Sequence, residues 1–223
     1  MSTYGNNLLA QYYAQQEALP NEYRRVEYIE SHKTQYVDSC LQATGSSYVM
    51  CDIMLLNLEL YANRILGNYN NNAKSYTINC AWETGVQVVN ISRFGALNSG
   101  RLDAIKFPLN TRHTVGNNKY GIIADGVVVH QWEAEQSFTT VGNVALLASS
   151  NASGAVPSTL NNGLYGRCYG IKWKENGVLI RNFIPCVRKS DGKPGLFDFC
   201  KSICPLTGTP FYINSGTGEF VTP

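Results

Sequence analysis

The stretch KYGIIADGVVVHQ, from Lys119 to Gln131, decides the fold of this chain. Asp125 and Gly126 separate two apolar, β-branched runs. An Asp-Gly pair in that setting predicts a two-residue hairpin turn, because both turn residues must adopt positive φ. The arrangement recurs where Asn176 and Gly177 separate GIKWKE from VLIRNF. Two such hairpins in a chain with hardly any helical periodicity predict an antiparallel β protein.

Short apolar runs with turn residues between them continue from Tyr23 onward. Tyr23 to Ser31 and Gln35 to Leu41 predict a first pair of strands joined by a polar turn, and Ser47 to Leu58 predicts a central strand. Further strands are predicted at 64–67, 75–82, 86–94, 101–107, 112–115, 144–148, 164–173, 178–188 and 196–199. So many short strands predict an all-β, two-sheet jelly-roll sandwich.

Composition narrows the classes of function. The chain has 223 residues, 44% of them hydrophobic and only 15% charged, so it can bury one large core. A net charge of +2 with scattered Lys and Arg argues against nucleic-acid binding. No run of 18 apolar residues occurs, and the N-terminus has no recognisable secretion signal, so we expect no membrane contact.

The seven cysteines are odd in number and lie mostly in apolar runs. We expect buried free thiols in a protein made in a reducing cytoplasm. A zinc site is the alternative, but Cys200 and Cys204 have no second pair or nearby His to complete it. Asp191 and Asp198 are too sparse for a calcium loop. We therefore predict no metal and no cofactor.

The N-terminal segment differs from the rest in composition. Residues 1–19 are rich in Gln, Asn and Tyr, and a short apolar face at helical spacing is formed by Leu8, Leu9, Tyr12 and Tyr13. Such a segment cannot form a stable helix alone in water. It is either a docking anchor, helical or extended, or a frayed tail. We divide the chain into this segment, 1–19, and a sandwich domain, 20–223.

Several stretches resemble a known family. They are LPNEYRRVEYIESHKTQYVDS from Leu19, TRHTV, YGIIADGVVV, NVALLASSNASG, the long run from Leu164 to Asp198, and FYINSGTGEF. Together they are similar to phage and prophage virion proteins of gut bacteria that carry a concanavalin A-like, laminin G-like lectin domain. The resemblance covers residues 19–223 and leaves residues 1–18 outside it.

That resemblance implies a fold, a location and partners. It implies a lectin-like sandwich in a virion structural protein of the tail, fibre, baseplate or head decoration, made in the bacterial host cytoplasm. The implied partners are other virion proteins, docked through residues 1–18, and host cell-surface polysaccharide. It also implies a homo-oligomer, either a trimer or an array. The matching motifs are mainly architectural, so they predict fold better than activity.

Candidate ligand-binding residues follow from sugar chemistry. Aromatic rings stack on the apolar face of a pyranose, and amide side chains bind its hydroxyls. The candidate rings are Tyr69, Trp82, Trp132 and Tyr165, and the candidate amides are Asn70, Asn71, Asn72, Asn161 and Asn162. Loops at sheet ends are where binding commonly resides.

The chain lacks a recognisable catalytic set. A retaining glycosidase needs two carboxyl groups about 5–5.5 Å apart, and the only alternating acids near a strand are Glu133 and Glu135. We read these two as solvated rim charges. His113 is expected to be structural, and no nucleophile elbow or P-loop occurs. We therefore expect a non-enzymatic protein, with a concanavalin A-like glucanase as the alternative.

Overall fold

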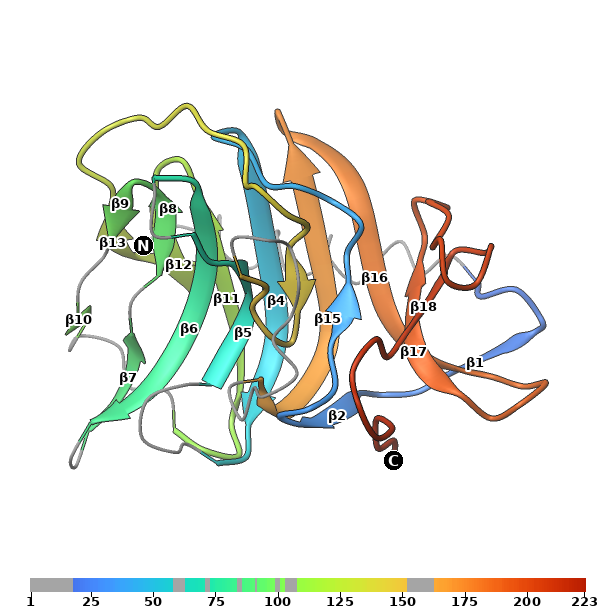
Figure 1. Cartoon of the computed structure of the whole chain (residues 1–223). Coiled ribbons are helices and arrows are strands. Elements are labelled where there is room, and N and C mark those ends of the chain that lie inside the picture. Colours follow the sequence, from blue (N-terminus) through green and yellow to red (C-terminus); the bar gives the residue numbers. More distant parts are fainter. Residues whose placement is uncertain are drawn as a thin grey trace, which may run out of the picture.

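The computed structural model describes residues 18–57, 63–70, 73–83, 86–90, 92–98, 101–102, 108–151 and 163–223. Its described part is all-β, as predicted, and consists of two antiparallel sheets that lie face to face (Figure 1). Tyr76 joins the sheets: its Oη accepts the Val49 N–H at 3.1 Å, and its O–H donates to the Asn117 carbonyl at 2.5 Å. The sandwich prediction is confirmed.

The larger sheet has ten strands and runs in the order β13-β12-β11-β4-β15-β16-β17-β18, with β1 beside β16 and β2 beside β15. Its strands are β1 (Tyr23–Arg25), β2 (Ile29–His32), β4 (Ser47–Leu55), β11 (Arg112–Asn118), β12 (Gly121–Ala124), β13 (Val127–Gln131), β15 (Tyr165–Glu175), β16 (Val178–Arg188), β17 (Pro194–Asp198) and β18 (Phe211–Ile213). The predicted central strand is β4, which pairs with β11 and β15.

The smaller sheet has eight strands in the order β10-β7-β6-β5-β14-β3, with β8 beside β6 and β9 beside β8. Its strands are β3 (Val37–Asp38), β5 (Asn63–Asn68), β6 (Ser75–Glu83), β7 (Val86–Asn90), β8 (Arg93–Gly95), β9 (Leu97–Asn98), β10 (Arg101–Leu102) and β14 (Ala145–Leu146). The single strand predicted over 86–94 is thus two strands, which pair with different parts of β6.

Both predicted hairpin turns are confirmed. Asp125 and Gly126 have φ of 48° and 80° between β12 and β13, and Asn176 and Gly177 have φ of 50° and 80° between β15 and β16. Asp125 also ties the turn to β11: its carboxylate accepts the Thr114 N–H at 2.8 Å and contacts His113 Nδ1 at 2.7 Å. His113 therefore has the structural role that we expected.

The predicted pairing of the first two apolar runs is wrong. Ile29 in β2 pairs with Cys168 of the larger sheet, whereas Val37 in β3 pairs with Leu146 of the smaller sheet. Between them Gln35 closes a turn, because its Oε1 accepts the His32 N–H at 2.7 Å. The chain crosses from one sheet to the other at this turn, and each strand finds its partner far away in the sequence.

The core lies between the sheets. Its largest fully buried side chains are Trp173, Tyr76, Tyr212, Phe94 and Phe183. The rings of Tyr76 and Trp173 stack across the core with centroids 6.3 Å apart. A second cluster, Ile184, Cys186, Phe197 and Phe211, lies on the opposite face of β16 and β17. The second half of β16, from Phe183 to Val187, is therefore buried on both faces, which explains its continuous apolar sequence.

The C-terminal segment packs along β2. The Glu30 N–H donates to the Val221 carbonyl at 2.8 Å, and the Val221 N–H donates back to Glu30 at 3.0 Å. Gly216 permits a close approach, since a Cβ there would lie 2.0 Å from the Thr34 carbonyl oxygen.

Other sequence predictions concern thiols, the N-terminal segment and membranes. Six cysteines of the described part are free; Cys51, Cys168, Cys186 and Cys204 are buried, as predicted. The anchor residues Leu8, Leu9, Tyr12 and Tyr13 lie outside the described residues, whereas Leu19 packs on the second cluster. Within the described ranges, no helix has the length and apolar character to span a bilayer.

Candidate functional site

A polar and aromatic surface lies on the outer face of the smaller sheet. Side chains alternate along β6: Tyr76 and Ile78 are in the core, so Thr77 and Asn79 point to the opposite side of the sheet, where Thr77 is only 1% exposed and Asn79 is half-buried. Arg64 in β5 pairs with Asn79. Arg93 in β8 pairs with Thr77 and therefore shares the same outer face.

Tyr69 lies at the centre of this surface. It follows the last residue of β5, and its backbone N–H donates to the Ser150 carbonyl at 2.8 Å. Its half-buried ring lies beside two guanidinium groups: the Cζ of Arg64 is 5.9 Å and the Cζ of Arg93 is 5.0 Å from the ring centroid. Thr77 is buried, and its Oγ1 accepts the Arg93 backbone N–H at 3.1 Å. We call the half-buried residues Arg64, Tyr69, Asn79 and Arg93 the Tyr69 face.

The Tyr69 face carries two positive charges, those of Arg64 and Arg93, without a neighbouring negative charge in the described part of the chain. Burial lowers the pKa of the Arg64 guanidinium, although the nearby Tyr69 acts in the opposite direction. The buried Nε of Arg93 has no hydrogen-bond partner among the described residues. In the same part of the chain, no carboxylate lies within 4.0 Å of either guanidinium.

The outer face of the larger sheet contrasts with this arrangement. Arg112 forms a two-pronged ion pair with Asp52, at 2.7 and 2.5 Å, and its Cζ lies 4.1 Å from the ring centroid of Tyr169. Arg167 Nε contacts Glu30 at 2.8 Å, and its Cζ lies 4.2 Å from the Tyr28 ring. Arg112 and Arg167 are therefore neutralised within the protein.

The structure does not bring the predicted aromatic candidates together. Trp132 is only 8% exposed: its Nε1–H donates to Asn117 Oδ1 at 3.1 Å, and its ring stacks on Phe94. It packs in the core and offers no platform to solvent. Tyr165 is half-buried at the start of β15, where the His32 ring lies edge-on at 5.2 Å. It therefore belongs to the larger sheet, whereas Tyr69 follows β5 of the smaller sheet.

The predicted amides divide in the same way. Asn70 follows Tyr69 directly, but it is only 8% exposed, and its backbone N–H donates to Ser75 Oγ at 2.8 Å. Asn70 thus closes the loop between β5 and β6 rather than presenting a free amide. The side chain of Trp82 and the residues Asn71, Asn72, Asn161 and Asn162 lie outside the described residues.

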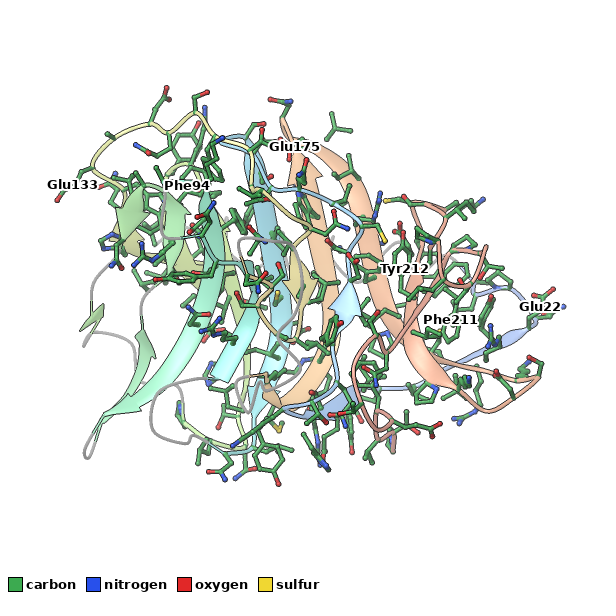
Figure 2. All side chains as sticks on the ribbon, in the orientation of Figure 1. Glu22, Phe94, Glu133, Glu175, Phe211 and Tyr212 are labelled. Atoms are coloured by element: carbon green, nitrogen blue, oxygen red, sulfur yellow. The ribbon has the colours of Figure 1, made fainter. Side chains whose placement is uncertain are left out.

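The predicted acidic pair, Glu133 and Glu135, does not lie side by side on a strand. Strand β13 ends at Gln131, so Glu133 and Glu135 lie in the irregular segment after it, and both are exposed. Glu135 has a side-chain exposure of 87%, and its carboxylate is 3.9 Å from Lys119 Nζ. Figure 2 shows Glu133 pointing away from the sheets. This placement agrees with our interpretation of the two acids as solvated rim charges.

A carboxylate that sequence reasoning missed is Glu175, at the end of β15 (Figure 2). It accepts hydrogen bonds from the hydroxyls of Thr44 and Ser46, and from Ser47 Oγ at 2.6 Å. Partial burial acts to raise the pKa of Glu175, but these donors outweigh it, so its pKa is lowered. The group clamps the loop before β4 onto the hairpin and faces no second acid in the described part.

Two further kinds of site can be judged from the described residues. They contain no group of three or more His, Cys, Asp and Glu side chains that could hold a metal ion. A depression of about 120 Å³ lies beside β18, lined by Lys193, Pro194, Ile213, Asn214, Gly216, Gly218, Glu219 and Phe220. It is small next to typical small-molecule sites of roughly 300–1,000 Å³.

Sequence reasoning identified Tyr69 but missed its two arginines. The signal for Thr77 and Asn79 is present in SYTINC, where polar residues alternate with Tyr76 and Ile78. The convergence of Arg64 and Arg93 has no such signal, because they lie on strands separated by β6 and approach the same ring only in the folded sheet.

The comparisons with known proteins agree with the fold. No family model matches the chain, and no curated protein does. Among solved structures, the chain is similar to a "putative carbohydrate binding protein" from Bacteroides ovatus, with a TM-score of 0.56 and 12% sequence identity. The match covers 90% of this chain and 60% of the other, so the chain spans less than two thirds of that protein's length.

Proposed function

We propose that this protein binds carbohydrate through the Tyr69 face and performs no catalysis on it. The observation that carries the proposal is a half-buried tyrosine ring surrounded by polar side chains on the outer face of a sheet. The accessible part of the ring can contact the apolar face of a sugar, while the guanidinium N–H groups of Arg64 and Arg93 can donate to its hydroxyls. Similarity to a carbohydrate-binding protein of the same fold supports this proposal.

We further propose that the domain belongs to a phage particle and contacts the surface polysaccharide of the bacterial host. Support comes from the motifs between Leu19 and Phe220, which resemble lectin-like virion proteins. The N-terminal segment, residues 1–18, would dock the domain onto another virion protein. Mass spectrometry of purified particles tests this setting, and absence of the protein from particles would rule it out.

Glycan binding itself is tested by substitution at the ring. Binding of host cell-wall polysaccharide should be saturable, and Tyr69→Ala should weaken it by about 10-fold, because stacking on one aromatic ring contributes roughly 1–1.5 kcal/mol. Tyr120→Ala is the matched control: Tyr120 is 63% exposed, beside the other sheet's hairpin, and its removal should leave binding unchanged. If both variants lost the same amount of polysaccharide affinity, the binding site would not be at the Tyr69 face.

A further inference from the structure

Two arginines converge on Tyr69 from opposite sides of β6. Thr77 pairs with Gly67 of β5 and with Arg93 of β8, so β5 and β8 must flank β6 on different sides. Adjacent strands lie about 4.8 Å apart, so roughly 10 Å of sheet separates the strands that carry Arg64 and Arg93. Their long side chains nevertheless reach the same ring, at 5.9 and 5.0 Å from its centroid.

This convergence concentrates positive charge without an internal counter-charge in the described part of the chain. Strands β11, β15 and β16 provide the comparison, since each of their arginines lies beside a carboxylate. The four pairs are Arg112 with Asp52 at 2.5 Å, Arg167 with Glu30 at 2.8 Å, Arg181 with Asp198 at 3.6 Å and Arg188 with Asp191 at 2.6 Å. Cations that are partly buried without such partners are costly, and an external anion would relieve that cost.

The type of anion follows from the groups around it. A guanidinium matches the geometry of a carboxylate with two parallel N–H donors. The half-buried Tyr69 ring, which lies beside both guanidiniums, provides an apolar contact for the sugar that bears the carboxylate. A neutral sugar would use the ring and the guanidinium N–H groups, but it would leave the positive charge uncompensated.

We propose that the Tyr69 face selects acidic saccharides, with the carboxylate of a uronic acid or similar sugar bound between Arg64 and Arg93. This inference rests on the proposed function, because it names the class of glycan taken by that same site. It also extends that function, because a neutral polysaccharide with the same backbone is predicted to bind poorly.

The test compares three saccharide probes by isothermal titration calorimetry with the full chain. The probes are oligogalacturonate, the same oligomer with its carboxyl groups reduced to alcohols, and a glycerol-phosphate polymer. We expect saturable binding of oligogalacturonate that weakens as salt is raised, and at least 10-fold weaker binding of the reduced oligomer. Phosphate polymer bound as tightly as oligogalacturonate would overturn selection for a carboxylate.

Substitutions of single arginines test whether oligogalacturonate binds at the Tyr69 face. Arg64→Gln and Arg93→Gln should each weaken oligogalacturonate binding by about 10-fold or more, because a charge-assisted hydrogen-bond pair is lost. Arg93→Lys should bind less tightly than wild type but better than Arg93→Gln, since it keeps the charge without the fork. Arg24→Gln is the matched control: it removes one charge from exposed β1 of the larger sheet and should leave affinity unchanged. A near-native unfolding temperature identifies variants that are folded.

The outcomes separate the two proposals. If reduced and acidic oligomers bind equally well, the acidic preference is wrong but carbohydrate binding stands. If neither these probes nor host polysaccharide bind, both proposals fail. If Arg24→Gln weakens binding as much as Arg93→Gln does, the effect is one of net charge and the assignment to the Tyr69 face is wrong.

Discussion

Polar and ionisable side chains that are buried or partly buried in this sandwich are stabilised by hydrogen bonds to nearby loops. Glu175 illustrates the principle: a carboxylate that would be costly to bury alone is stabilised by the hydroxyls of Thr44, Ser46 and Ser47. Asn68 is fully buried, and its amide donates to Ser150 Oγ at 2.7 Å and to the Asn151 carbonyl at 2.9 Å. Such groups hold loops against strand ends.

The first prediction concerns pH. The pKa of Glu175 is lowered in the folded protein, so its contribution is present above the unfolded pKa and is lost as pH falls through the folded value. Glu175→Gln should therefore lower the free energy of unfolding by about 1 kcal/mol at pH 7 and flatten the acid side of the stability curve. Urea unfolding between pH 2 and 7 measures this. Glu135→Gln, at an 87% exposed side chain, should leave the curve unchanged.

The second prediction concerns the thiols. Burial raises the pKa of Cys168 and of Cys186 to about 12, so almost no thiolate exists at pH 8. Iodoacetamide should label half-buried Cys200 in the native protein well before Cys168 and Cys186, which should react at once after unfolding. Peptide mass spectrometry over time measures this order. Rapid native labelling of Cys168 would contradict the burial of β15.

At the scale of elements, hairpins and cross-strand ion pairs maintain the larger sheet. The β15–β16 hairpin is the longest pairing that a local turn nucleates, with both strands of 11 residues. Strand β4 lies between β15 and β11, and Asp52 on β4 bonds to Arg112 on β11. These contacts keep the outer face of the larger sheet rigid and electrically compensated.

The third prediction tests the turn. Gly177 has φ of 80°, and a Cβ there would meet nothing within 4 Å, so only backbone strain opposes a side chain. Gly177→Ala should lower the free energy of unfolding by about 1–2 kcal/mol. Gly177→Asn should recover part of that loss, because Asn tolerates the left-handed region. Chemical denaturation measures the free energy of unfolding of both variants. A Gly177→Ala variant as stable as wild type would contradict the turn geometry.

The fourth prediction tests the ion pair on the larger sheet. The side chain of Asp52 is only 4% exposed, whereas that of Arg112 is 39% exposed. Arg112→Ala should cost about 2 kcal/mol, since it leaves a buried carboxylate without its partner. The double variant Arg112→Ala with Asp52→Ala should be less destabilised than the sum of its singles. Additive losses in this thermodynamic cycle would show that the pair contributes nothing.

At the scale of the molecule, the predicted boundary between the N-terminal segment and the sandwich lies close to Leu19. The side chain of Leu19 packs on the second cluster, as that of Tyr23 does. Opposite outer faces also differ in character: one carries compensated ion pairs, and the other carries the Tyr69 face. A domain docked through its N-terminal segment could present that face to a host surface.

The fifth prediction tests whether the N-terminal segment and the sandwich domain have separate roles. Deleting residues 1–17 should leave the thermal unfolding temperature and glycan affinity of the domain unchanged, because the deletion keeps Leu19, which packs on the second cluster. The same deletion should abolish incorporation into particles, measured by immunoblotting of purified virions. A variant that folds, binds glycan and still enters particles would show that docking uses the sandwich itself.

The sequence alone determined the features that depend on neighbouring residues. Asp125-Gly126 and Asn176-Gly177 specify their turns because only a few residue types accept positive φ, and period-two alternation identifies strands such as β6. These features suffice for the all-β sandwich. The tertiary structure decided which strands pair across the chain, because β2 and β3 look alike locally but join different sheets.

The site shows the same division. Aromatic residues look equivalent in a sequence, yet Trp132 lies in the core, Tyr165 on one sheet and Tyr69 on the other. Burial depends on what packs above a residue, and that is supplied by segments distant in the chain. The meeting of Arg64 and Arg93 at one ring is likewise a product of strand order, so only the folded molecule could reveal it.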